Sequence, residues 1–208
     1  RAPAMPAPRK ALFLDRDGVI NIDHGYVCTP DRTDFVDGIF ALCAGAQALG
    51  YRLIVATNQA GIARGYFSEA DFSAYMDWMR GIFREQGIEF TAMYHCPHHA
   101  GEGLGAYRIV CDCRKPAPGM LLRAIREHAL DASTCVLIGD KDTDIEAGRA
   151  AGLGFLIRLD ADAGTAAPAA APDVRAVASL HEALRVLEQC SREQVLRPSA
   201  SGRPTRPK

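Results

Sequence analysis

Two carboxylates, Asp15 and Asp17, lie one residue apart directly after an apolar run, in the stretch FLDRDGVIN. Gly18 follows at once and permits a turn, so both acids can face one ligand. Crowded carboxylates repel one another unless a cation joins them, and oxygen ligands with open water positions suit Mg²⁺. A carboxylate can also be a nucleophile while a second acid moves protons. The pair therefore indicates metal-assisted chemistry with two carboxylates in different roles.

Polar residues also follow two further apolar runs. Thr57 comes after the run LIVA, and Asp140 after CVLIG, while Lys115 lies in the segment CRKP before a predicted helix. A hydroxyl and an ammonium can hold a transferring phosphoryl group by hydrogen bond and charge. Each motif alone is common, since a DxD can be a solvated loop and a GD an N-cap. Their order, each after its own strand, indicates a phosphoryl-transfer site. The sequence has no GxxxxGK[ST] loop, so it gives no sign of a nucleotide phosphate site of that kind.

A group of thiols and imidazoles lies in CPHHAGEGLGAYRIVCDCRKP, residues 96–116. Three thiolates and one imidazole form the closed tetrahedral set that structural zinc prefers. The expected ligands are Cys96, His98, Cys111 and Cys113. His99 and His95 compete for the imidazole position, and free thiols or one labile disulfide are the alternatives. A closed site leaves no position for water, so we expect Zn²⁺ to order the loop and place Arg114 and Lys115, which follow it.

Composition limits the class of protein. The chain has 208 residues, a net charge of -1 and 48% apolar residues, which is typical of a soluble domain and gives no sign of nucleic-acid or membrane partners. The seven cysteines are an odd number, which argues against a disulfide framework. We expect a cytoplasmic protein. We expect disordered ends at 1–9 and 191–208, the latter basic, and one domain over 10–190 with the zinc loop at 96–113.

Apolar runs alternate with helical patterns along that domain. Strands are expected at 11–14, 53–56, 91–94, 135–140, 155–158 and 173–178, and helices at 38–49, 68–86, 118–129, 142–151 and 179–189. Unbroken apolar strands that alternate with helices predict an α/β fold with a doubly wound, Rossmann-like, mostly parallel sheet and helices on both faces. Ligands of such sheets bind beyond the carboxyl ends of the strands, where the polar residues above would meet.

The order DRDG, TN, RKP and GDKDTD resembles the haloacid dehalogenase superfamily of phosphohydrolases. The resemblance implies that Asp15 is the nucleophile and Asp17 the general acid/base, while Thr57 and Lys115 hold the phosphoryl group. It implies a Mg²⁺ site made by Asp15, the backbone carbonyl of Asp17, and Asp140. Lys141 stands where many members have a second acid, so only its backbone carbonyl is available to the metal.

Longer stretches resemble one family of that superfamily, the heptose bisphosphate 7-phosphatases, which are related to the histidinol phosphatases. They are FLDRDGVINIDHGYV, TNQAGIARGYF, CPHH, CDCRKPAPGMLL and GDKDTDIEAG, within residues 10–159. The family implies no large cap domain and removal of a 7-phosphate in the synthesis of ADP-heptose for lipopolysaccharide. It implies substrate contacts from Arg16, Asp23, His24, Gly25, Tyr26, Asn58, Gln59, Ala60, Arg114, Lys115 and Lys141. Arg114 is the best fork for a second phosphate.

Three alternatives stay open at this point. The first is the same chemistry on histidinol phosphate or another small sugar phosphate. The second is a switch domain that accepts phosphate on aspartate, although Asp17, two residues after Asp15, and the cysteine cluster argue against it. The third is a zinc-dependent interaction module. The sequence leaves the preferred anomer at C1 undecided, and a monomer is expected because no helix shows an obvious exposed apolar face.

Overall fold

Six parallel strands form one sheet in the computed structural model, which describes residues 9–160 and 173–196. The strands are β1 (Ala11–Leu14), β2 (Arg52–Asn58), β3 (Phe90–Cys96), β4 (Val136–Gly139), β5 (Phe155–Leu159) and β6 (Val174–Val177). Their spatial order is β3-β2-β1-β4-β5-β6, and every neighbouring pair is parallel. The chain winds outward in both directions from β1, so the crevice between β1 and β4 is the switch point where such folds bind ligands. The predicted doubly wound sheet is confirmed.

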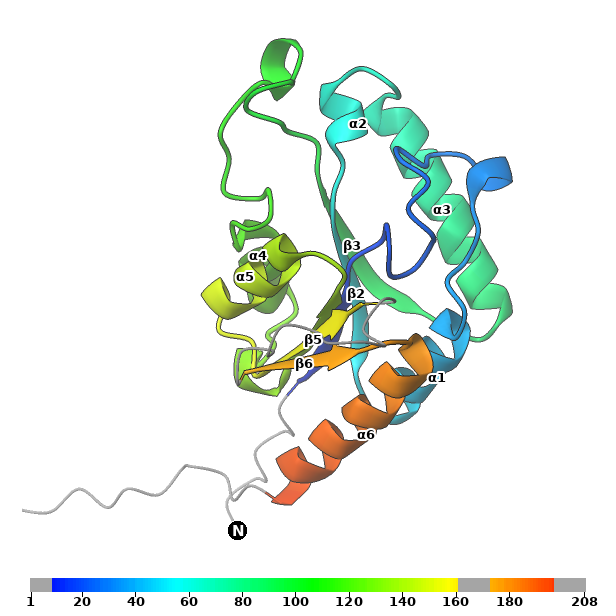
Figure 1. Ribbon diagram of the computed structural model, residues 1–208, viewed down its shortest axis with the longest axis vertical. Coiled ribbons are helices and arrows are strands. Elements are labelled where there is room, and N and C mark those ends of the chain that lie inside the picture. Colours follow the sequence, from blue (N-terminus) through cyan, green and yellow to red (C-terminus); the bar gives the residue numbers. More distant parts are fainter. Residues whose placement is uncertain (1–8, 161–172, 197–208) are drawn as a thin grey trace, which may run out of the picture.

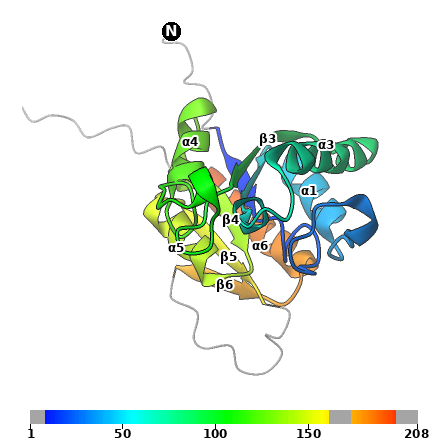
Figure 2. The same cartoon turned by 90° about the horizontal axis from the view of Figure 1, so that it is seen from above.

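Helices cover both faces of this sheet (Figures 1 and 2). On one face lie α1 (Ile39–Ala48), α3 (Glu69–Glu85) and α6 (Leu180–Leu196), and on the other α4 (Gly119–Glu127) and α5 (Asp142–Ala150). The side chains of β1 alternate between the two cores: Leu12 and Leu14 pack on the first face, Ala11 and Phe13 on the second. Burial on both faces explains why the strands read as continuous apolar runs.

The predicted elements are present, and their ends differ by no more than two residues except at α6. This helix was expected to end at residue 189, with a disordered tail from 191, but it continues to Leu196. The boundary was wrong because Cys190 and Ser191 are buried, and Lys10 Nζ donates a hydrogen bond of 2.9 Å to Ser191 Oγ. The other predicted disordered residues, 1–8 and 197–208, lie outside the described residues.

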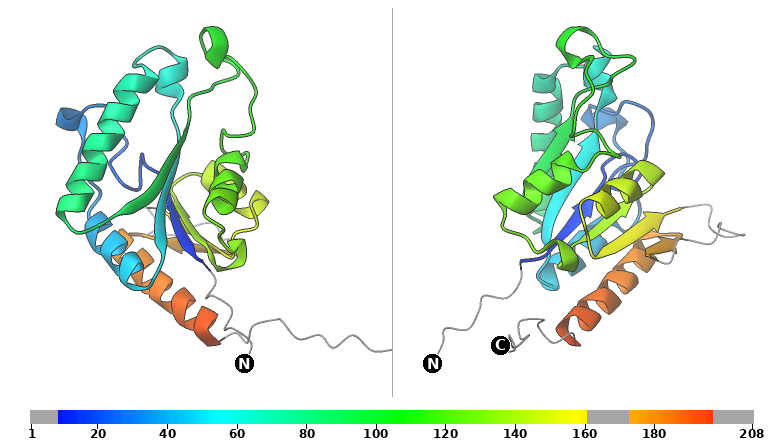
Figure 3. Two further views of the ribbon diagram at one scale, coloured as in Figure 1. Left: turned by 180° about the vertical axis from the view of Figure 1, so that it is seen from behind. Right: turned by 90° about the vertical axis from the view of Figure 1, so that its left-hand side faces the viewer.

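Three connections gather at the carboxyl end of the sheet (Figures 1 and 3). They are the segment 15–38, the turn after β2 that carries the short helix α2 (Ala60–Ala63), and the long loop between β3 and α4. Sequence patterns missed α2 and the 3-10 turns η1 (Pro30–Arg32), η2 (Gly105–Tyr107) and η3 (Ala132–Thr134). No cap domain is inserted in the described chain, and none of its helices has the length and apolar character needed to span a bilayer.

Candidate active site and zinc centre

Three carboxylates meet at the switch point of the sheet. Asp15 follows β1, Asp140 follows β4, and Asp144 lies in the first turn of α5, with ligand oxygens within 4.8 Å of one another. Asp15 and Asp144 border a cavity of about 330 Å³, which Asp17 and Thr57 also line. The expected gathering of strand-end residues is therefore present in the structure. Asp144, the last acid of the stretch GDKDTD, joins this group although its spacing predicts no role for it.

Lys115 is the counterion of this group. Its Nζ lies 2.9 Å from Asp15 Oδ1 and 2.5 Å from Asp144 Oδ1, and it donates a hydrogen bond of 2.7 Å to the carbonyl of Ala56. Burial alone would lower the pKa of Lys115, but the charges of the two carboxylates outweigh it and raise that pKa. The backbone of Lys115 is held in turn by Asn58, whose amide group bonds to both its N–H (3.0 Å) and its carbonyl (2.9 Å).

The acidic group fits a Mg²⁺ ion. Burial raises the pKa of Asp15 despite the opposing charge of Lys115, and burial, with Asp15 and Asp144 nearby, raises the pKa of Asp140 to about 6. Asp140 Oδ1 is buried without a hydrogen-bond partner in the described chain. Gly18 leaves room for this carboxylate, since a Cβ there would overlap the Asp140 side chain. Excess negative charge and an unpaired buried oxygen are what a hard divalent cation would satisfy.

Asp17 takes a different environment from Asp15. Its carboxylate accepts hydrogen bonds from Arg16 Nη2 (2.6 and 2.7 Å), Asn21 Nδ2 (3.0 Å) and Gln59 Nε2 (3.1 Å). The side chain is 15% exposed and borders the same cavity as Asp15. Gln59 Nε2 also donates to Thr57 Oγ1 at 2.9 Å. Gln59 therefore links Asp17, the expected acid/base, to Thr57, which is expected to hold the phosphoryl group.

The predicted substrate contacts fall into two groups. Those that line the cavity are Asp23, Gly25, Tyr26, Asn58, Gln59, Ala60, Lys115 and Lys141, together with the unpredicted Gly61, Thr143 and Asp144. Lys141 Nζ lies 3.0 Å from Asp23 Oδ2; this contact lowers the pKa of Asp23 although burial opposes it. Arg16, His24 and Arg114 do not line the cavity.

Each of these three side chains has another partner. Arg16 is fully buried below the site, and His24 Nε2 lies 2.7 Å from Asp34 Oδ2. Arg114 Nη1 donates to the carbonyl of His98 at 3.1 Å, within the cysteine loop.

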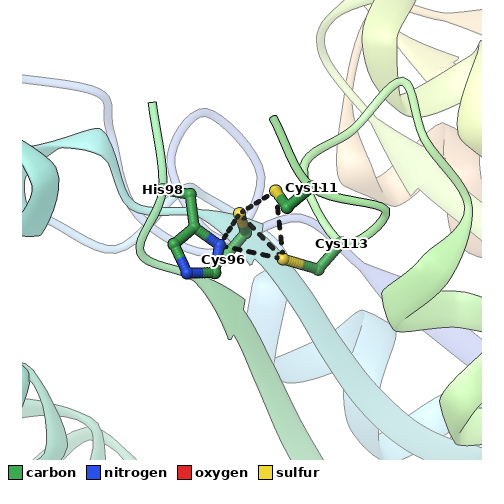
Figure 4. A group of neighbouring side chains, drawn as sticks. All are labelled: Cys96, His98, Cys111 and Cys113. Atoms are coloured by element: carbon green, nitrogen blue, oxygen red, sulfur yellow. Dashed lines mark hydrogen bonds between the residues drawn. The ribbon is translucent and has the colours of Figure 1, made fainter. Parts of the chain in front are cut away.

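The predicted zinc ligands converge (Figure 4). The Sγ atoms of the three cysteines lie 3.1 to 3.6 Å apart, and His98 Nδ1 lies 3.7 Å from Cys96 Sγ and 3.4 Å from Cys113 Sγ. A tetrahedral zinc site with Zn–S bonds of about 2.3 Å places its sulfur atoms about 3.8 Å apart, so the four atoms fit Zn²⁺. None of the seven cysteines forms a disulfide in this structure.

The competing imidazoles are engaged elsewhere. His99 Nδ1 accepts a hydrogen bond of 3.0 Å from the N–H of Glu102, and His95 Nε2 lies 3.4 Å from Glu69 Oε2. His98 is therefore the imidazole that the fold brings to the thiols. The same loop is joined to the turn after β2, because Leu104 N–H donates to the Ala63 carbonyl at 2.8 Å and Arg64 pairs with Glu102.

Comparisons with known proteins agree with this geometry. A family model described as HAD-hydrolase-like matches residues 112–183. D-glycero-alpha-D-manno-heptose-1,7-bisphosphate 7-phosphatase of Burkholderia mallei is 50% identical over 167 residues, which cover 80% of this chain and 88% of that protein. D-glycero-beta-D-manno-heptose-1,7-bisphosphate 7-phosphatase of Vibrio cholerae is 49% identical over 149 residues, which cover 72% of this chain and 80% of that protein. The chain belongs to the D-glycero-D-manno-heptose-1,7-bisphosphate 7-phosphatase family.

Solved structures support this family assignment. The D,D-heptose 1,7-bisphosphate phosphatase of B. bronchiseptica, complexed with magnesium and phosphate, is 28% identical, with a TM-score of 0.72 over 87% of this chain and 98% of that chain. A HAD-like phosphatase of Mesorhizobium loti is 33% identical, with a TM-score of 0.78 over 91% of both chains. This chain thus shares the fold of a solved heptose bisphosphate phosphatase.

Proposed function

We propose that this chain is a Mg²⁺-dependent phosphatase that removes the 7-phosphate of D-glycero-D-manno-heptose 1,7-bisphosphate in the synthesis of ADP-heptose. The observation that carries the proposal is the buried Asp15 carboxylate, which lies beside Lys115 and shares one cavity with Asp17. The 50% sequence identity to the Burkholderia mallei 7-phosphatase supports it. The nucleophile, its counterion and a second acid are the parts that aspartyl-phosphate chemistry needs.

The proposed reaction has two steps. Asp15 attacks phosphorus, the bond from phosphorus to the C7 oxygen breaks, and Asp17 gives its proton to that oxygen. A water molecule then attacks the aspartyl phosphate, Asp17 takes its proton, and the bond from Asp15 to phosphorus breaks to release inorganic phosphate. Lys115 and Thr57 stabilise the charge of the phosphoryl group throughout.

Mg²⁺ held by Asp15, Asp140 and the Asp17 carbonyl would supply charge neutralisation at the phosphoryl oxygens. Asp144 supports this set indirectly, since it shares Lys115 with Asp15. Zn²⁺ held by Cys96, His98, Cys111 and Cys113 would act structurally. Its four protein ligands leave no open coordination position for a reacting water.

The remaining contacts concern the sugar and its second phosphate. Lys141 lines the cavity and is available to a phosphate once it exchanges its partner Asp23. Arg114 is fixed through the His98 carbonyl and is proposed as the fork that meets the phosphate at C1. His24 and Arg16 would contact substrate only through atoms other than their engaged side-chain nitrogens.

We further propose that the protein is a cytoplasmic monomer. Seven cysteines that form no disulfide suit a reducing compartment. Of the large apolar side chains that are exposed in the described residues, only Leu122 lies on a helix, which supports a monomer. Light scattering of the purified protein would test the oligomeric state, and a stable dimer at micromolar concentration would contradict it.

The test of the function is phosphate release, with Mg²⁺, from both anomers of heptose 1,7-bisphosphate beside histidinol phosphate and fructose 1,6-bisphosphate. We expect kcat/KM on the better heptose anomer to exceed that on histidinol phosphate and on fructose 1,6-bisphosphate by about 100-fold or more. This ratio corresponds to ~2.7 kcal/mol of transition-state discrimination. Asp15→Asn and Asp17→Asn should be folded and inactive in this steady-state assay. Asp17→Asn keeps its nucleophile, so a residual rate about 10²- to 10⁴-fold below that of the wild type should remain measurable at high enzyme concentration. Comparable rates on all substrates would leave a general sugar phosphatase, and release from none would reject the enzyme.

A further inference from the structure

Arg16, between the two catalytic carboxylates, has an environment that the proposed reaction does not yet use. Its side chain is fully buried, and its Nη2 lies 2.6 and 2.7 Å from the two oxygens of Asp17 and 2.7 Å from the Val27 carbonyl. One guanidinium nitrogen thus ties the carboxylate of Asp17 to the backbone of the following loop. Such charge-assisted bonds are stronger and more directional than neutral ones.

The rest of this guanidinium rests on α3. Its central carbon lies 5.4 Å from the ring centre of Phe72 and 5.2 Å from that of Tyr75. Arg16 Nε and Nη1 are buried with no hydrogen-bond partner among the described residues, so the aromatic faces are their main contact. A cation held in this way by rings and by a backbone carbonyl has little freedom to move. It is also shielded from the cavity that would hold the substrate.

We propose that Arg16 is a positioning residue, which fixes the Asp17 carboxylate toward the leaving oxygen, and that its side chain does not contact the substrate. The inference rests on the proposed function, in which Asp17 is the general acid/base. Misplacing a catalytic group by about 1 Å can cost on the order of 100-fold in rate. Asn21 and Gln59 add weaker bonds of 3.0 and 3.1 Å to the same carboxylate, so removal of Arg16 loosens Asp17 without releasing it completely.

The test exploits the leaving group. A sugar alkoxide needs a proton as it departs, whereas p-nitrophenolate does not. In kcat/KM, which covers only the steps up to the aspartyl phosphate, a misplaced acid therefore slows only the sugar substrate. For Arg16→Met we expect kcat/KM on the sugar bisphosphate to fall about 100-fold, and on p-nitrophenyl phosphate less than about 5-fold. Arg16→Lys, which keeps the charge, should lose about 10-fold on the sugar bisphosphate. Arg84→Met, at the exposed end of α3, is the matched control and should behave like the wild type.

Two further measurements separate positioning from damage to the fold. Binding of inorganic phosphate with Mg²⁺, measured by calorimetry, should stay within about 3-fold of the wild type in Arg16→Lys, because Asp15, Thr57 and Lys115 are untouched. In an Asp17→Asn background, Arg16→Met should cost less than about 3-fold more on the sugar bisphosphate, since a residue that acts through Asp17 has nothing left to position.

Equal losses on both substrates, or an undiminished loss in the Asp17→Asn background, would overturn the inference. So would an Arg16→Met enzyme as fast as the wild type on the sugar bisphosphate. Failure of the proposed function is distinguishable, because it would show in the wild type as turnover of p-nitrophenyl phosphate without heptose bisphosphate turnover. Glycerol 3-phosphate then serves as the alkyl substrate, and the same comparison decides the role of Arg16.

Discussion

Replacement of Lys115 by methionine tests the buried charge pair at the centre of the site. The Lys115 side chain is 3% exposed and faces Asp15 and Asp144, which are 7% and 2% exposed. Methionine fills a similar volume but removes the positive charge, the two ion pairs and the hydrogen bond to the Ala56 carbonyl. Two buried carboxylates, both close to Asp140, would then have no cation in a protein without Mg²⁺.

The magnitude follows from burial. Breaking a buried ion pair by removing one partner costs about 3–5 kcal/mol, because an uncompensated charge is left behind. A domain is stable by only about 5–15 kcal/mol, so the free energy of unfolding should fall by about a fifth or more at pH 7. The loss should shrink as the pH falls toward 4. Burial already raises the pKa of Asp15, so this carboxyl can take up a proton instead of remaining an unpaired charge.

The assay is urea unfolding in reducing buffer without Mg²⁺, followed by the fluorescence of Trp78, the single tryptophan. The matched control is Lys141→Met, which removes an ion pair of 3.0 Å to Asp23 from a side chain that is 52% exposed. Solvent-exposed pairs contribute about 0–1 kcal/mol, so this variant should unfold close to the wild type. If Lys115→Met loses no more than Lys141→Met at pH 7, the reasoning about the buried pair is refuted.

Other perturbations probe the two metal sites. His98→Ala should lose zinc on dialysis and several kcal/mol of stability, whereas His99→Ala should retain one zinc per chain by elemental analysis. Gly18→Ala places a Cβ against Asp140 at a φ of +90°, so the Mg²⁺ concentration for half-maximal activity should rise about 10-fold or more. The control is Gly87→Ala, at a φ of +73° with open space around it. It should cost only about 1 kcal/mol of stability and leave that Mg²⁺ concentration unchanged. The pKa of Asp140, about 6 against its usual 3.8, means that its stabilising contribution is present below pH 4 and is lost as the pH rises to 6. Without Mg²⁺, the free energy of unfolding of Asp140→Asn minus that of the wild type should therefore increase from pH 4.5 to pH 7, as measured by urea unfolding. An equal difference at both pH values would contradict this direction.

The strands and the reacting residues could be predicted from the sequence for one physical reason. A strand buried on both faces must be apolar throughout, so a carboxylate or hydroxyl marks the point where it leaves the core. Asp15 and Asp140 each follow a strand directly, and Thr57 is the next-to-last residue of β2. Ser68 is a second case of a local rule that holds. Its side chain accepts a hydrogen bond from the Asp71 N–H, and the Asp71 carboxylate accepts one from the Ser68 N–H. This capping box begins α3 at the predicted position.

What escaped prediction depends on contacts between distant segments. Asp144 has the sequence appearance of an acid in the first turn of a helix, a place where acids are common for electrostatic reasons. Its partner Lys115 is 29 residues away along the chain by residue number, and only the packing of α4 and α5 brings the two within 2.5 Å. The end of α6 was missed for a similar reason, because the charged residues after Cys190 hide the contact of Ser191 with Lys10.

The sheet itself joins the zinc centre to the reacting residues. In the ladder between β2 and β3, Asn58 lies opposite Cys96, the first zinc ligand, and the Gln59 N–H donates to the Cys96 carbonyl at 2.8 Å. At the other end of the cluster, Cys113 lies two residues before Lys115, whose backbone is held on both sides by Asn58. Zinc would therefore close a ring that runs from β2 through β3 and the loop back to β2. Because the Lys115 ammonium lies on this ring, loss of zinc should misplace it and reduce turnover before the rest of the sheet unfolds.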